Sequence, residues 1–185
     1  TKPSEVVTPT YPLDVKKTDT KDTMLAGAHF KLYASTTDGN IDKNKVIKVT
    51  KDVENTDGKY TYAANQSAED AIDEMVTVAN KIDEQGYNLH INGLAEGTYY
   101  LVETKAPDGF NKLTAPVVIK ITKSADTDVN KWTISKDGTV ENDKIIDIEN
   151  STGSLLPSTG GRGAIAFAVI AALLVFGVAV SFIRD

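Results

Sequence analysis

The feature that most constrains this chain is an uncharged apolar run close to its C-terminus. Residues 164–183 read AIAFAVIAALLVFGVAVSFI, twenty positions without a charged side chain. A helix of this length spans roughly 30 Å at about 1.5 Å per residue, the thickness of a bilayer's hydrocarbon core. A core helix is rarely apolar on every face, so we predict a transmembrane helix and short tail at 164–185. About 160 residues then remain outside, enough for one domain with a core.

The rest of the composition excludes several classes of function. The formal net charge is −6 and no cluster of lysines and arginines stands out, which argues against nucleic-acid binding. The chain has no cysteine, which excludes thiol catalysis, cysteine-ligated metals and disulfides. No Ser-His-Asp set, phosphate loop or carboxylate pair is visible. We therefore expect no cofactor and no enzyme that turns over a substrate.

Two weaker signals favour structural roles. Alternate positions of the segment 38–44 carry Asp or Asn, like the start of a calcium loop. However, Lys43 stands where an EF-hand requires glycine and Val49 where it requires glutamate, so a solvated hairpin loop is the better interpretation. No metal site is expected. His29 and His90 fall on the outward faces of their predicted strands and have no obvious partner.

Short alternating segments separated by turn signals indicate an all-β sandwich over 13–150. Asp-Gly pairs at 38–39, 57–58, 108–109 and 137–138 mark the turns. The predicted strands cover 13–17, 29–35, 45–50, 59–64, 87–91, 98–104, 116–122, 131–135 and 144–150. Residues 1–12 contain three prolines and are interpreted as a linker from a preceding domain that is missing here. Residues 151–163 form a flexible tether.

One segment departs from the β pattern. Ser67 followed by Asp70 resembles a capping box. The apolar residues that follow repeat at helical spacing, namely Ile72, Met75, Val76 and Ala79. The spacing predicts a short inserted helix at about 68–82, with its apolar stripe as a packing face.

The alternation of side chains along three strands carries the strongest chemical implication. Side chains alternate between the two faces of a strand, so every second residue points the same way. If the apolar residues face the core, then one polar residue on each strand points inward as well. The three sets are Leu13, Val15 and Lys17; Tyr99, Leu101 and Glu103; and Ile146, Ile148 and Asn150.

A buried lysine, glutamate and asparagine together suit the formation of an amide. A desolvated Lys17 loses its proton and becomes a nucleophile. A protonated Glu103 can polarise the Asn150 carbonyl and pass a proton to departing ammonia. The product is a Lys–Asn isopeptide bond between the first and last strands. The alternative is that Lys17 and Asn150 lie at strand ends in solvent while Glu103 caps a turn. Lys16, the rival nucleophile, shares its face with Asp14 and Thr18.

The segment before the apolar run resembles the cell-wall sorting signal of Gram-positive bacteria. It consists of Leu156, Pro157, Ser158, Thr159 and Gly160, followed by the apolar span and Arg184. Pro157 favours an extended backbone at Leu156, and Gly160 leaves the Thr159 carbonyl accessible. The resemblance implies that a sortase cleaves between Thr159 and Gly160 and transfers the acyl group to an amine. The tail departs from the usual pattern, because Arg184 is its only basic residue after the span and Asp185 follows it.

Three motifs in the domain resemble Gram-positive pilins and Cna-B-type adhesin stalk domains. Residues 99–110, YYLVETKAPDGF, resemble the E-box, YxLxETxAPxG followed by an aromatic residue. Residues 25–30, LAGAHF, resemble the LAGAxF segment, and 92–99 resemble GLxxGTY. The resemblance implies a Cna-B/Ig-like sandwich with a lysine in the K-x-D of its first strand and an asparagine in its last. It therefore favours the Lys17–Asn150 bond, with Glu103 as the catalyst of a single turnover.

The resemblance also implies a function and a location. The segment from 149 to 161, ENSTGSLLPSTGG, is similar to the ends of major (backbone) pilins. A structural subunit of a sortase-assembled pilus is therefore expected, secreted to the cell surface and anchored in the wall. Its partners would be sortase, neighbouring pilin subunits, peptidoglycan, host ligands and, before sorting, the membrane. The alternatives are a minor or basal pilin, a stalk domain of a wall-anchored adhesin, and the stalk of a wall-anchored enzyme. The acceptor lysine is not in this fragment, because Leu13 follows Tyr11-Pro12 where that lysine would stand.

Overall fold

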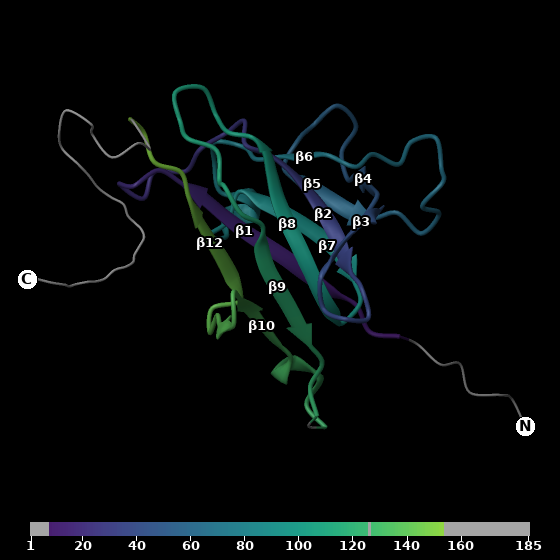
Figure 1. Cartoon of the computed structure of the whole chain (residues 1–185). Helices are drawn as coiled ribbons and strands as arrows, with labels where there is room; N and C mark the ends of the chain where they lie inside the picture. Colours follow the sequence, from purple (N-terminus) through teal and green to yellow (C-terminus); the bar gives the residue numbers. More distant parts are fainter. Residues whose placement is uncertain (1–7, 126, 154–185) are drawn as a thin grey trace, which may run out of the picture. The chain divides into compact units, whose positions relative to one another are not determined.

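The computed structural model describes residues 8–125 and 127–153, which Figure 1 shows as strands joined by turns. The described residues divide between two units, one drawn from 8–108 and 112–150 and the other from 109–111 and 151–153. Strands of the larger unit form two sheets, and a single hydrophobic cluster draws residues from both. Among the described residues, helix is confined to two short 3₁₀ turns, η1 (Ile82–Glu84) and η2 (Val129–Lys131). The predicted all-β sandwich is therefore confirmed.

The first sheet has five strands in the order β12–β1–β7–β5–β4. These are β1 (Tyr11–Thr18), β4 (Val49–Lys51), β5 (Lys59–Tyr62), β7 (Leu89–Leu94) and β12 (Ile145–Glu149). β12 runs parallel to β1, with Ile148 opposite Lys17. β7 pairs with the other edge of β1 and runs antiparallel to it. The first and last strands of the domain are therefore direct neighbours.

The second sheet follows the order β11–β10–β9–β8–β2–β3, and β6 also pairs with β2. Its strands are β2 (His29–Ser35), β3 (Ile41–Val46), β6 (Met75–Val76), β8 (Gly97–Lys105), β9 (Val117–Thr122), β10 (Thr133–Lys136) and β11 (Thr139–Val140). The longest of them, β8, pairs with β2 along one edge and with β9 along the other. Figure 1 shows β8 running along the middle of this sheet. A residue that points inward from β8 is therefore well shielded from water.

Burial alternates along the strands as the sequence predicts. Inward positions of β1, β8 and β12 are buried and the positions between them are more exposed. The observed β2 has the predicted bounds, and the other predicted strands overlap observed ones with ends that shift by a few residues. The predicted strand at 45–50 is divided between β3 and β4. β1 begins at Tyr11, inside the segment that the sequence assigns to a linker.

The predicted helix at 68–82 is wrong. This segment forms successive turns, the short strand β6, and the beginning of η1. Ser67 donates its backbone N–H to the Asn65 side chain and does not begin a helix. Ile72 forms a bridge with Val49, while Met75 pairs with β2. The apolar residues at helical spacing therefore pair with strands on either side of the segment instead of lining one face of a helix. The β-branched residues 76–78 also disfavour a helix.

The smaller unit is short in the part that the structure describes. Asn111 donates its backbone N–H to the Ser151 carbonyl at 2.8 Å and its side-chain amide to the Gly153 carbonyl at 2.9 Å. No helix within 8–125 or 127–153 is long and apolar enough to cross a membrane. The sorting motif 156–160 and the predicted transmembrane segment 164–185 lie outside the described residues.

Candidate functional site

Lys17 projects from β1 into the space between the two sheets. Its alternation with Leu13 and Val15 places the side chain on the core face, and it is 0% exposed. The Nζ atom lies 3.9 Å from Oε2 of Glu103 and has no hydrogen-bond partner in the described part of the chain. Burial outweighs the attraction of Glu103 and Glu149 and lowers the pKa of the Lys17 amine to about 8. The amine is therefore available as a nucleophile at a pH far below the usual lysine range.

Glu103 approaches the same point from β8 in the opposite sheet. It is 2% exposed, and Phe30 of β2 is its cross-strand neighbour. Its Oε1 accepts the backbone N–H of Leu113 at 2.8 Å and the Asn150 side-chain amide at 2.9 Å. Its Oε2 makes no hydrogen bond within the described residues and faces Lys17. One carboxylate oxygen of Glu103 thus contacts the Asn150 amide, and the other faces the Lys17 amine.

Asn150 directly follows β12 and is 1% exposed. Its backbone N–H donates to the Thr18 carbonyl at 2.9 Å, so the parallel pairing of β12 with β1 continues to this residue. Since Ile148 is opposite Lys17, Asn150 shares the core face of that sheet with the lysine. The structure therefore brings together all three inward residues that the sequence singles out.

One detail differs from the sequence-based hypothesis. The hypothesis has a protonated Glu103 polarising the Asn150 carbonyl. In the structure, Glu103 accepts a hydrogen bond from Nδ2 of Asn150, the nitrogen that would leave as ammonia. Because Oε1 also accepts from Leu113, this oxygen acts as an acceptor toward both neighbours. The arrangement suits proton transfer to the leaving group more directly than activation of the carbonyl.

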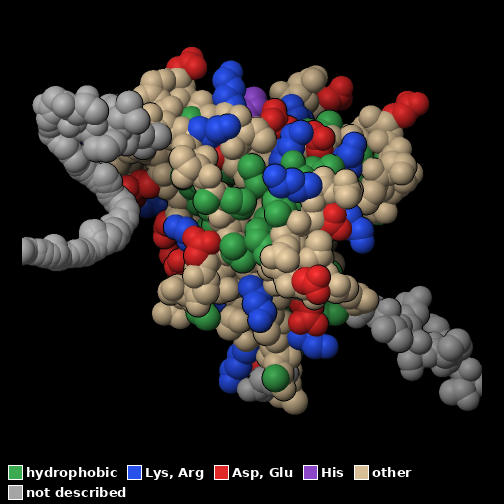
Figure 2. Space-filling model, viewed as in Figure 1, with side chains coloured by type: hydrophobic (Ala, Val, Ile, Leu, Met, Phe, Trp, Pro, Cys, Tyr) green, Lys and Arg blue, Asp and Glu red, His purple; other side chains and the backbone are tan. Residues whose placement is uncertain are grey.

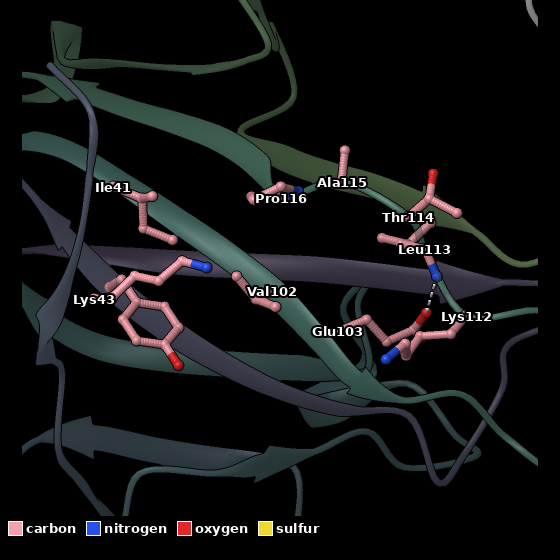
Figure 3. A pocket seen from close by; sticks show the side chains of 10 residues that line it. Ile41, Lys43, Val102, Glu103, Lys112, Leu113, Thr114, Ala115 and Pro116 are labelled. Atoms are coloured by element: carbon pink, nitrogen blue, oxygen red, sulfur yellow. Dashed lines mark hydrogen bonds between the residues drawn. The ribbon is translucent and has the colours of Figure 1, made fainter.

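A groove of about 460 Å³ borders the site, and Figure 3 shows that the Glu103 carboxylate and the Leu113 backbone lie at one end of it. In Figure 2, hydrophobic side chains gather near the middle of the visible face, with lysines and acidic residues around them. The groove is lined in part by Ile41, Lys43, Val102, Lys112 and Pro116. It provides a solvent-facing surface next to a carboxylate that is itself almost fully buried.

Two supporting groups escaped the reasoning from sequence. The Leu113 backbone N–H holds Glu103, and no side-chain pattern signals a main-chain donor of this kind. Asn88 bonds to the backbone of Lys17. Strand alternation would put Asn88 on the same face as His90, away from the core, but Asn88 precedes β7 and turns inward. Only the tertiary structure reveals either contact.

The other candidates have ordinary partners. His29 contacts Glu74 at 2.8 Å and His90 contacts Asp14 at 2.5 Å, so the expectation that the histidines lack partners is wrong. The rival nucleophile, Lys16, pairs with Asp22 at 2.8 Å on the outer face.

The segment 38–44 lies in and after the turn between β2 and β3. Within the described residues, no cluster of three or more acidic or histidine side chains could hold a metal ion.

Comparison with known proteins gives one family and several relatives. Residues 12–137 match the family described as SpaA, prealbumin-like fold domain. The fimbrial subunit type 1 of Actinomyces viscosus is 35% identical over 104 residues, which cover 50% of this chain and only 17% of that subunit.

A minor pilin of Streptococcus agalactiae is similar in structure, with a TM-score of 0.48 and 24% identity over 85% of this chain and 50% of that one. The shaft pilin SpaA of Lactobacillus rhamnosus GG has a TM-score of 0.45 and 23% identity over 80% of this chain and 50% of that one. Because the family match covers more than half of the chain, this protein belongs to the SpaA family of prealbumin-like fold domains.

Proposed function

We propose that this chain is a structural subunit of a sortase-assembled pilus, stiffened by an internal amide bond between Lys17 and Asn150. The observation that carries the proposal is the buried cluster of Lys17, Glu103 and Asn150 between the sheets. A buried lysine charge without a hydrogen bond is costly, so a purely structural role for all three residues would lower the stability of the fold. Conversion of the amine into an amide removes that cost.

The proposed reaction is balanced within the three residues. The neutral Nζ of Lys17 attacks Cγ of Asn150 and forms a C–N bond. Oε2 of Glu103 takes a proton from the attacking amine, and the carboxyl group then passes this proton to Nδ2, which leaves as ammonia when its bond to Cγ breaks. Glu103 is unchanged at the end, and the chain has lost one NH₃. The observed contacts of the two carboxylate oxygens match these two roles.

Intact mass measures the proposed bond directly. The folded protein should weigh about 17 Da less than its sequence predicts, because one ammonia departs in the amidation. Each of Glu103→Ala, Lys17→Ala and Asn150→Ala should restore the full mass in a chain that still folds.

The matched control is Lys16→Ala, which removes a neighbouring lysine that faces outward and should keep the deficit. A well-folded wild-type protein with the full sequence mass would rule out the bond.

The second half of the proposal concerns Thr159. Sortase would cleave between Thr159 and Gly160 and transfer the acyl group to an amine of the next subunit or of peptidoglycan. Incubation with a sortase from the source organism should release the segment that begins at Gly160. Thr159→Ala should block release and the high-mass ladders of polymer, whereas Ser158→Ala should leave both intact. Normal wall attachment of the Thr159→Ala protein would contradict this part of the proposal.

A further inference from the structure

Asn88 is a buried polar residue that the proposed chemistry does not use. It lies directly before β7 and is 0% exposed. Its Oδ1 accepts the Lys17 backbone N–H at 2.7 Å. Its Nδ2 donates to the carbonyls of Lys17, Leu25 and Val78 at 3.2, 3.1 and 2.9 Å. A single side chain therefore joins three segments of backbone, and both main-chain groups of Lys17 are among its partners.

This side chain takes the place of a missing strand partner. The paired register of β1 and β7 ends at Val15 and Leu89, and the Asn88 N–H still donates to the Val15 carbonyl at 2.9 Å. At Lys17 the pairing with β7 has ended, and the Asn88 carboxamide supplies a donor and an acceptor in its stead. The Leu25 backbone N–H also donates to the Lys17 carbonyl, at 2.9 Å. On the other edge, Lys17 is opposite Ile148 of β12. The strand β1 is therefore held along both edges around Lys17, by Asn88 on one side and by the pairing with β12 on the other.

The backbones that carry the two reacting side chains are thus held at neighbouring positions of β1, Lys17 and Thr18. Asn150 is tied to β1 through its backbone bond to Thr18, at 2.9 Å. Lys17 is tied by Asn88, and its amine lies at the end of a long and flexible side chain. Displacement of reacting atoms by about 1 Å can cost a reaction on the order of a hundredfold in rate. A shift of the β1 backbone would separate the amine from both Glu103 and Asn150.

We infer that Asn88 is a positioning residue for amide formation, which clamps the Lys17 backbone so that the amine meets Asn150. The inference rests on the proposed function, since it concerns the rate of the same reaction. Asn88 touches none of the reacting atoms and carries no proton that titrates. Its loss should therefore slow the reaction equally at every pH and leave the pH midpoint of the rate unchanged.

The test compares two substitutions in one polar network. Asn88→Ala removes the clamp. Thr77→Val is the matched control, because Thr77 is 2% exposed and its hydroxyl bonds to the Leu25 carbonyl and the Ala28 N–H without contacting Lys17. Full-length chain isolated unfolded from inclusion bodies is refolded by dilution into buffered detergent at several pH values. Intact mass then follows the loss of ammonia with time, and circular dichroism reports the folded fraction.

Asn88→Ala should slow the mass change in folded protein by about tenfold or more, with the wild-type pH midpoint. Thr77→Val should lower the melting temperature yet react at close to the wild-type rate. Equal rates in Asn88→Ala and Thr77→Val would overturn the inference. Asn88→Ser, whose side chain is too short to reach Lys17, should behave like Asn88→Ala. If neither Asn88 variant folds, Asn88 is needed for folding itself and the inference is overturned. A wild-type chain that never loses ammonia would instead contradict the proposed function itself.

Discussion

At the residue scale, the energetics of Lys17 explain why the reaction should proceed. Its amine is fully buried, and its ion-pair contact with Glu103 is 3.9 Å long. A buried charge without hydrogen bonds costs several kcal/mol, and neutralisation is the usual response. The depressed pKa of about 8 reflects this cost. Amide formation replaces the ionisable amine by a neutral group that suits the apolar surroundings.

The pKa of Lys17 predicts how the rate of amide formation depends on pH. Only the neutral amine attacks, so the rate should rise as pH increases through about 8 and level off above it. At pH 6 about 1% of the amine is neutral, and the rate should lie about a hundredfold below the plateau. Refolding of unlinked chain at pH 6 to 9.5, followed by intact mass, gives the profile.

Folding at each pH is followed in parallel by circular dichroism, and Glu103→Ala serves as the unreactive control. A rate that stays flat from pH 6 to 9 would contradict attack by an amine with this pKa. It would indicate that the proton passes directly from Lys17 to Glu103 before the attack.

The same scale shows what the sequence can and cannot predict about the site. Inward alternation is a local property of each strand, and it identifies Lys17, Glu103 and Asn150 without any knowledge of strand order. Their mutual distances depend on the parallel register of β12 with β1 and on the opposite sheet, which local patterns do not specify. Asn88 and the Leu113 N–H act through the backbone of distant segments, so they could not be predicted.

At the element scale, the sequence patterns predict most strands closely but wrongly predict a helix within the segment 63–82. Where alternating residues lie between clear turns, as in β2 and β8, the predicted strands are close to the observed ones. In 63–82 the apolar residues recur at irregular intervals, so helical and extended spacing are hard to distinguish. Edge pairing with Val49 and with β2 decides the conformation. The segment contributes to the core, since Met75 is 0% exposed and belongs to the hydrophobic cluster.

This role predicts the effect of truncating Met75. Met75→Ala should lower the free energy of unfolding by about 2–4 kcal/mol, because it leaves a cavity in the core. Glu69→Ala, at an exposed position of the same segment, should change it by less than about 0.5 kcal/mol. Chemical denaturation in the Glu103→Ala background, where no crosslink forms, measures both. Equal effects of the two substitutions would mean that Met75 contributes little to the stability of the core.

At the scale of the whole domain, the arrangement of the first and last strands determines how the protein bears load. β1 and β12 are parallel neighbours, so a pull on the start of β1 and on the chain after Asn150 shears one strand along the other. A bond between Lys17 and Asn150 lies directly on this path. Tension would then pass through β1 and the amide, and the chain between residues 17 and 150 would carry none. The same bond closes a long loop, worth about 4–5 kcal/mol in the chain-entropy model.

Single-molecule pulling distinguishes these two states of the domain. With the amide present, stretching between the start of β1 and the residue after Asn150 should show no unfolding step before the molecule detaches from the pulling device. Glu103→Ala keeps the strands but lacks the catalyst, so each molecule should unfold and release roughly 440–480 Å of chain, the extended length between Lys17 and Asn150. Lys16→Ala should behave like the wild type, since the bond forms without that lysine. An unfolding step of this length in wild-type molecules whose mass shows the lost ammonia would place the amide elsewhere in the domain, because a covalent bond between residues 17 and 150 leaves that length of chain unavailable to the applied force.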